Sequence, residues 1–352
     1  MLFVKYIPMM KEVARMPSSL PKTRDHQTQL DWHPHHRHIR EPLSWQATAL
    51  NLTLRSTLKP VLARVNVSHR TIWMAQRLYS LASPLLARLP ESVDLQAVDF
   101  EHFTGEWIRA GQHLDENKVL LYLHGGGYFF SSAALHRPIT WRLSLACKRP
   151  VLAINYRMAP AYQFRHWLDD AVTAYTHLLE RGYQPHNILV AGDSAGGNLV
   201  LIMLQSLRHQ GLPLPAACIC LSPWTDITGG SASMHHNRHQ DPMFAARAVS
   251  GVGRYVSQGV DPEHPWVSPA KADLSGFPPL MIMVGSTEVL RDDALRVAER
   301  ARAYGVPVVY EEWVAMPHVF PIFAAFMPEA RKAYQHIARF VRDVDRHRGD
   351  YE

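Results

Sequence analysis

The feature that most constrains the fold is a glycine-flanked serine between a strand pattern and a helix pattern. The apolar run at residues 188–191 is followed by GDSAG at 192–196 and then by a helical run at 198–207. A strand that turns this sharply into a helix holds its central residue in a strained backbone conformation, and the flanking glycines avoid side-chain clashes. The pattern therefore predicts that the Ser194 hydroxyl stands clear of a sheet, beside a helix N-terminus that favours an anion.

From about residue 93, runs of strand length alternate with amphipathic helical patterns. The runs are apolar or β-branched and lie at residues 119–123, 151–156, 188–191, 216–221, 280–284 and 308–313. Helical patterns between them end at Gly182 and Gly305, because glycine readily adopts the left-handed conformation with which many helices end. This alternation is typical of a mostly parallel sheet with helices on both faces, so we predict an α/β fold over residues 96–352.

The first 95 residues have a different pattern. Apolar residues recur at helical spacing over 43–62 and 71–88, which indicates two helices that need a partner surface. Residues 17–42 are polar, contain Pro and His, and are predicted to be irregular. We interpret residues 1–95 as a helical cap segment and the Gly- and His-containing stretch at 228–265 as a second cap insertion.

Composition limits the partners. The net charge of +6 comes with no basic run and no aromatic-interleaved basic stripe, so we expect a solvated surface and no nucleic acid, the alternative being a weak attraction toward anionic interfaces. Lys5 and Pro8 interrupt the first apolar run, so we expect no signal segment and no stable membrane insertion, and a protein that is cytoplasmic or loosely peripheral. Three cysteines in apolar stretches suggest buried thiols in a reducing compartment.

A second glycine run follows the strand pattern at 119–123. In His124-Gly125-Gly126-Gly127, three consecutive glycines would be costly to order in a helix or strand. Their amides can instead converge with that of Ala195 on one oxygen and form an oxyanion hole. A phosphate-binding loop is the rival interpretation, but no Lys-Ser/Thr follows the glycines. We expect His124 to hold the loop in place.

These motifs and their order resemble the hormone-sensitive-lipase-like family of α/β-hydrolases. The resemblance covers roughly residues 95–345 and includes HGGG at 124–127, YRMAP at 156–160, LDDA at 168–171, GDSAGG at 192–197 and SPW at 222–224. It implies an α/β-hydrolase fold, a helical cap formed partly by the N-terminal residues, hydrolysis of esters with fairly short acyl groups, and no cofactor. It also implies that Gly126 and Gly127, together with Ala195, supply the oxyanion donors.

The other members of a catalytic triad are expected after the serine, first an acid and then a histidine. His318 follows the strand pattern at 308–313 in a Pro-His context similar to that of the family, which usually has Gly where this chain has Val319. The family generally has Asp at the position of Glu288, and Glu can also accept the Nδ1 hydrogen bond. Asp292 is the alternative acid, although it is expected to begin the next helix.

The expected activity is therefore that of a carboxylesterase with Ser194, His318 and Glu288 as its triad. An amidase or peptidase would use the same triad, and a non-catalytic ligand receptor or a scaffold with a vestigial site could share the fold. The cluster of His33, His35, His36 and His38 could in principle bind a metal, but it lacks paired ligand spacing, so we expect no metal site. The expected partner is a small-molecule ester, with a homodimer as a further possibility.

Overall fold

The computed structural model describes residues 35–86 and 88–349, and residues 1–34 of the predicted cap segment lie outside this part. The described part contains a nine-stranded sheet with the order β1-β9-β8-β7-β6-β4-β5-β3-β2. Its strands are β1 (His35–Ile39), β2 (Val93–Asp99), β3 (Thr104–Ala110), β4 (Val119–Leu123), β5 (Val151–Asn155), β6 (Ile188–Asp193), β7 (Ala217–Leu221), β8 (Leu280–Gly285) and β9 (Val308–Trp313). The prediction of a mostly parallel sheet is confirmed.

Parallel pairing extends from β1 to β5, and β3 pairs antiparallel with both β5 and β2. The central strands are apolar runs because both of their faces are covered; β4, β7 and β8 are buried along their whole length. Parallel strands end at the same edge of a sheet, so the loops after β4, β6, β8 and β9 gather there. These loops carry every catalytic residue predicted from the sequence.

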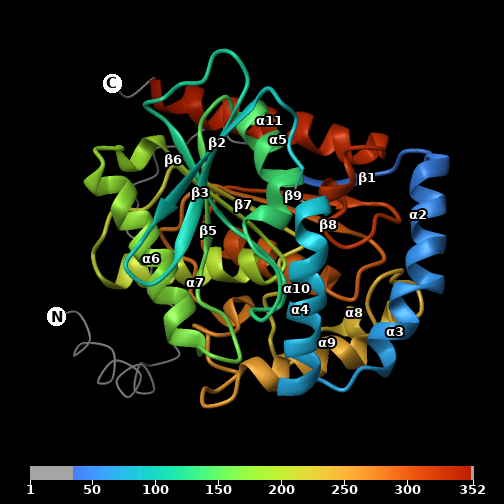
Figure 1. Cartoon of the computed structure of the whole chain (residues 1–352). Coiled ribbons are helices and arrows are strands. Elements are labelled where there is room, and N and C mark those ends of the chain that lie inside the picture. Colours follow the sequence, from blue (N-terminus) through green and yellow to red (C-terminus); the bar gives the residue numbers. More distant parts are fainter. Residues whose placement is uncertain (1–34, 87, 350–352) are drawn as a thin grey trace. The chain divides into compact units, whose positions relative to one another are not determined.

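Helices cover both faces of the sheet (Figure 1). The α5 helix (Arg137–Cys147) lies beside α11 (Pro328–Gly349) on one face. The connections β5–α6–β6, β6–α7–β7 and β8–α10–β9 all step across the sheet in the opposite direction from β4–α5–β5. Because such crossovers are right-handed, α6 (Phe164–Glu180), α7 (Ala195–His209) and α10 (Arg291–Ala303) lie on the other face.

Two boundaries predicted for the N-terminal region differ from those in the structure. Residues 35–39 fall in the segment predicted to be irregular, but they form β1, which pairs in parallel with β9. The predicted boundary at residue 95 lies inside β2, so the sheet takes in residues of the segment interpreted as cap. The helix predicted at 43–62 is two helices, α2 (Trp45–Ser56) and α3 (Leu58–Arg64), and the helix predicted at 71–88 is α4 (His69–Leu86).

The stretch at 228–265 contains two helices, α8 (Ala232–His236) and α9 (Ala246–Val256). Its role as a second cap insertion stays a prediction. Cys147, Cys218 and Cys220 are free and buried, which confirms the prediction of buried thiols. Within the described residues, we find no helix that combines the length and the apolar character needed to cross a membrane.

Candidate active site

Ser194 occupies the turn between β6 and α7. Its backbone angles, φ 52° and ψ −119°, lie in a region that residues other than glycine rarely adopt. The turn is therefore strained, as the sequence predicted. A Cβ atom at Gly196 would overlap the carbonyl oxygen of Leu123 on the neighbouring strand, which explains the glycine. The turn is held by the Ser194 amide, which donates to the Leu221 carbonyl at 2.9 Å.

The loop after β4 lies against this turn. The Gly125 amide donates to Asp193 Oδ1 at 2.9 Å, and Gly126 has a φ of 110°, where its missing Cβ leaves room for the Phe130 carbonyl. In the described part of the chain, the amides of Gly126, Gly127 and Ala195 donate no hydrogen bond to another protein group. An oxygen atom placed between the two loops could therefore accept from them.

His124 holds this loop and is fully buried. Its Nδ1–H donates to the Gly125 carbonyl at 2.7 Å, and its ring stacks on Tyr156 at 4.4 Å between centroids. Burial, together with the nearby His136, lowers the pKa of His124 to about 3, so the ring is neutral. These contacts agree with the expected role of His124 in holding the loop.

The loops after β8 and β9 bring Glu288 and His318 together. His318 Nδ1 lies 2.7 Å from Glu288 Oε2, and both side chains are buried. Burial alone would lower the pKa of His318, but the Glu288 carboxylate outweighs it and raises this pKa above its usual value. The His318 imidazole makes its hydrogen bond through Nδ1, and its Nε2 takes part in no hydrogen bond among the described residues.

Asp292 is placed elsewhere. It lies in the first turn of α10, as expected, and its Oδ2 accepts from the Ser233 amide at 2.9 Å while its amide donates back to the Ser233 hydroxyl at 3.0 Å. Its carboxylate also pairs with Arg291 at 2.8 Å. The carboxylate that contacts His318 is thus that of Glu288.

Ser194 and His318 belong to loops that share a hydrogen-bonded connection through the end of β7. Leu221 accepts from the Ser194 amide, and the next residue, Ser222, accepts from the Val319 amide at 3.1 Å. No hydrogen bond joins Ser194 Oγ to His318 in the described chain, and such bonds are often long without substrate.

Comparisons with known proteins agree with this architecture. Residues 120–322 match the family model described as alpha/beta hydrolase fold. An acetyl-hydrolase of Streptomyces hygroscopicus is 41% identical over 68% of this chain and 80% of its own length, and an esterase of Acinetobacter venetianus is 31% identical over 72% and 84%. A crystal structure of an esterase from the bacterial hormone-sensitive lipase (HSL) family superposes with a TM-score of 0.78, at 36% identity, over 86% of this chain and 99% of that one.

The chain belongs to the hormone-sensitive-lipase-like family of α/β-hydrolases. A second solved relative, EstE5, was soaked with p-nitrophenyl butyrate and superposes with a TM-score of 0.79 at 34% identity, covering 86% of this chain and 99% of that one.

The structure adds a buried acid–histidine pair that sequence reasoning missed in this family member. Asp193 Oδ2 lies 3.1 Å from His136 Nε2, and Asp193 Oδ1 accepts from the Tyr122 hydroxyl at 2.6 Å. Burial favours the neutral form of Asp193, but His136 and these hydrogen bonds outweigh burial and lower the pKa of the carboxyl below its usual value. Its place beside the nucleophile was the available signal, because a charged residue buried there needs a partner.

Ser222 is a second missed residue. Its hydroxyl donates to Glu288 Oε1 at 2.7 Å, and its oxygen accepts from the Val319 amide. Val319 itself has a φ of 50°, in the left-handed region, which explains why the family usually has glycine at this position. The backbone around His318 is therefore held by the same hydroxyl that holds the acid.

The histidine cluster of the sequence is partly present at the sheet edge. The possible ligand atoms of His36, His38 and Glu312 lie within 4.8 Å of one another. Among the described residues, this is the group of side chains that could hold a metal ion. However, Glu312 accepts from Arg291 at 2.8 Å and from the Tyr310 hydroxyl at 3.2 Å. His33 lies outside the described residues, as does the side chain of His35.

Proposed function

We propose that this carboxylesterase cleaves esters with short to medium acyl chains through an acyl-enzyme, with Ser194 as nucleophile, His318 as general base and Glu288 as the acid. The observation that carries the proposal is the 2.7 Å contact between His318 Nδ1 and the buried Glu288 carboxylate. This contact fixes the tautomer whose Nε2 is free to accept a proton.

In the first step His318 Nε2 takes the hydroxyl proton of Ser194 as the oxygen attacks the ester carbonyl. The tetrahedral intermediate collapses, the protonated imidazole gives its proton to the departing alkoxide, and an acyl-serine remains. In the second step His318 takes a proton from water, hydroxide attacks the acyl carbon, and the Ser194 oxygen leaves with the proton from His318. The Glu288 side chain accepts the Nδ1 hydrogen bond and stabilises the imidazolium in both steps.

The oxyanion of both intermediates would be stabilised by the amides of Gly126, Gly127 and Ala195. These amides have no protein acceptor in the described chain, and Ala195 is the first residue of α7, where the helix dipole adds to the stabilisation. Removing one such donor typically costs about 3 kcal/mol of transition-state stabilisation.

The cap is part of the proposal. Gln76 of α4 donates to the Phe129 carbonyl at 2.6 Å beside the glycine loop, and Phe244, just before α9, packs its ring 4.8 Å from that of His318. Helices from residues 1–95 and 228–265 would thus bound the acyl pocket. The acyl-chain preference rests on the relatives, of which one is named an acetyl-hydrolase and another was soaked with a butyrate ester.

The test is the hydrolysis of p-nitrophenyl esters from acetate to palmitate by the wild type and Ser194→Ala. We expect rapid turnover of the acetate and butyrate, a fall along the series, and no turnover by the serine variant. A fluorophosphonate probe should label the wild type and leave Ser194→Ala unlabelled.

Inactivity of the folded wild type on every ester would contradict the proposal. Cleavage of matched amides by the same folded protein would then favour an amidase, and ligand binding without turnover would favour a receptor. A cytoplasmic location and a homodimer stay predictions.

A further inference from the structure

The charge of the chain is distributed unevenly along the sequence. Residues 42–90 contain six Lys and Arg residues and no Asp or Glu, so this segment carries the whole formal charge of +6 and the rest of the chain is balanced. The basic residues are dispersed, which is why no basic run stands out. The uneven feature is the absence of acids across α2, α3 and α4.

The outward face of α4 combines cations with large apolar side chains. Arg70, Trp73, Met74 and Arg77 have the spacing i, i+3, i+4, i+7 and therefore share one face of the helix. Trp73 is 56% exposed and Met74 47% exposed, and the Arg77 guanidinium lies 5.4 Å from the centre of the Trp73 ring. Large apolar side chains that are grouped on a surface and flanked by charged residues are typical of an interaction site.

The two preceding helices repeat the pattern. Trp45 and Leu52 lie seven residues apart on one face of α2 and are 76% and 63% exposed, while Ala47 on the same helix is buried. On α3, Val61 and Arg64 are both exposed and three residues apart. Both helices thus present large apolar side chains away from the core. On α3 the valine lies next to an arginine, whereas Arg55 of α2 donates to the Gln240 carbonyl at 2.9 Å.

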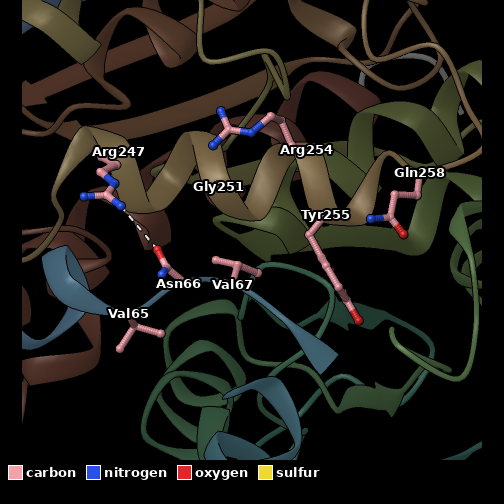
Figure 2. A pocket seen from close by; sticks show the side chains of 8 residues that line it. All are labelled: Val65, Asn66, Val67, Arg247, Gly251, Arg254, Tyr255 and Gln258. Carbon is pink, nitrogen blue, oxygen red and sulfur yellow. Dashed lines mark hydrogen bonds between the residues drawn. The ribbon is translucent and has the colours of Figure 1, made fainter. Parts of the chain in front are cut away.

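The basic surface continues onto α9. This helix contains Arg247 and Arg254, both exposed, and the chain from 242 to 260 has no acidic residue. Figure 2 shows the pocket of about 250 Å³ that lies between α9 and the turn connecting α3 to α4. Arg247 donates to Asn66 Oδ1 at 3.2 Å, so α9 contacts the turn between α3 and α4.

Other side chains of α4 and α9 contact the glycine loop of the candidate site. Gln76 of α4 bonds to the Phe129 carbonyl, and Val252 of α9 packs beside Gly127 of the glycine loop. A surface that contacts the outer faces of α4 and α9 would therefore lie one helix away from the reacting groups.

We propose that the outward faces of α2, α3, α4 and α9, here called the basic cap face, dock on a bilayer surface rich in anionic phospholipids. Tryptophan, leucine and valine side chains would enter the interfacial zone, and the arginines would contact lipid phosphates. This docking is independent of the assignment of the catalytic triad. It would bring the site close to ester substrates that partition into the membrane.

Charge and composition favour a bilayer over other occupants. A second copy of the chain would place two basic cap faces against each other, and like charges repel. A nucleic acid would match the charge but would leave leucine, valine and methionine without apolar contacts. An anionic bilayer surface satisfies both kinds of side chain, and shallow binding needs no helix that spans the membrane.

The test is co-sedimentation of the full-length protein with vesicles at about 50 mM salt, where charge attraction is weakly screened. We expect binding to vesicles of phosphatidylcholine and phosphatidylglycerol and little binding to phosphatidylcholine alone. Arg64→Glu/Arg70→Glu should weaken binding by about tenfold or more, and Trp45→Ala/Leu52→Ala should weaken it severalfold.

The matched control is Arg339→Glu/Arg342→Glu, which makes the same change in net charge at exposed positions of α11. It should bind vesicles nearly as well as the wild type, and far-UV circular dichroism checks that all variants are folded. The proposal fails if the wild type ignores anionic vesicles, if the control weakens binding equally, or if Trp45→Ala/Leu52→Ala has no effect. Binding is measured without turnover, so a failed esterase assay leaves this result readable.

Discussion

Two buried acid–histidine pairs belong to the candidate site around Ser194, and they differ in the contacts of the imidazole. In one, His318 Nδ1 contacts Glu288 at 2.7 Å; in the other, His136 Nε2 contacts Asp193 at 3.1 Å. In both, burial would lower the pKa of the histidine, but the carboxylate outweighs burial and raises it. The pKa of the histidine is therefore shifted in the same direction in both pairs.

The difference lies in the second ring nitrogen. His136 Nδ1 lies 3.1 Å from the Ser132 carbonyl and 3.2 Å from the Ser131 hydroxyl, and its Nε2 lies 3.1 Å from Asp193, so both ring nitrogens have protein partners. His318 has one nitrogen engaged within the described chain. The comparison teaches that a carboxylate beside a buried histidine does not by itself distinguish a pair that holds a loop from the proposed proton-transfer pair. The distinguishing feature is the second ring nitrogen, which has no protein partner in His318 within the described residues.

The largest effect should separate the two histidines. We expect His318→Gln to lower kcat by about 10⁴-fold in p-nitrophenyl butyrate hydrolysis, because no general base remains. His136→Gln should retain activity but lower the free energy of unfolding in urea by about 3–5 kcal/mol, since Asp193 loses its buried partner. Loss of turnover without loss of stability in His136→Gln would break the comparison.

The carboxylates should follow the same division. Glu288→Gln should lower kcat by about 10³-fold or more, because an amide can hold the ring in the wrong tautomer and cannot stabilise the imidazolium. Asp193→Asn keeps the shape but removes the charge beside His136, so it should mainly lower the urea midpoint. Steady-state kinetics and urea unfolding of both variants provide the measurement. Equal losses of kcat would mean that the Asp193 pair also takes part in the reaction.

A smaller effect should come from the hydroxyl that supports each acid. Tyr122→Phe removes the 2.6 Å bond to Asp193, and Ser222→Ala removes the 2.7 Å bond to Glu288. Hydrogen bonds to charged groups contribute about 1.5–3 kcal/mol, so Tyr122→Phe should lose stability in this range and keep its kcat. Ser222→Ala should lose roughly tenfold in kcat, measured with the same ester. The reverse pattern would contradict the assignment of the two pairs.

The smallest effect is in the pH dependence. Only neutral His318 accepts a proton, so kcat/KM should rise with pH through a midpoint above 6.5, and Glu288→Gln should move this midpoint toward acid pH. The pair at Asp193 affects stability instead. Stabilisation by His136 is complete below pH 6.5 and is lost as pH rises through its raised pKa, whereas stabilisation by Asp193 is present above pH 3.8.

The stability difference between wild type and His136→Gln should therefore be largest between about pH 4 and 6.5 and shrink in alkali. Urea unfolding across this pH range checks it. A difference that grows with pH would mean that His136 is neutral in the folded protein.

The sequence allowed the central strands to be predicted because strands covered on both faces must be continuously apolar. The edges could not be predicted in this way. Residues 35–39 read HHRHI, and they form a strand because β9 offers a free edge, which is a tertiary effect. The predicted helix at 43–62 is divided because Pro60 has no amide for a continuous hydrogen-bond ladder, so the chain restarts at Leu58.

The site was predictable where function fixes the local sequence. The motifs predict the roles of Ser194 and the glycine loop, and chain order predicts those of His318 and Glu288, two residues that lie 2.7 Å apart in the structure. Ser222 and His136 were missed because their roles depend on packing: His136 is one of 21 histidines, and nothing beside it in sequence shows that it meets Asp193. Residues that position other residues leave the weakest pattern.

The pairing of β1 with β9 has a consequence for the order in which the chain folds during synthesis. The first described strand of the chain pairs with the last, His35 with Val309, so it leaves the ribosome long before its partner exists. Until β9 is synthesised, β1 has no strand to pair with. Once synthesised, β9 has an unpaired edge until β1 docks, and this edge can pair with a strand of another molecule. Slow translation before β9 would prolong this interval. The pairing of β1 with β9 is therefore a step at which the chain can pair with another molecule instead of with itself.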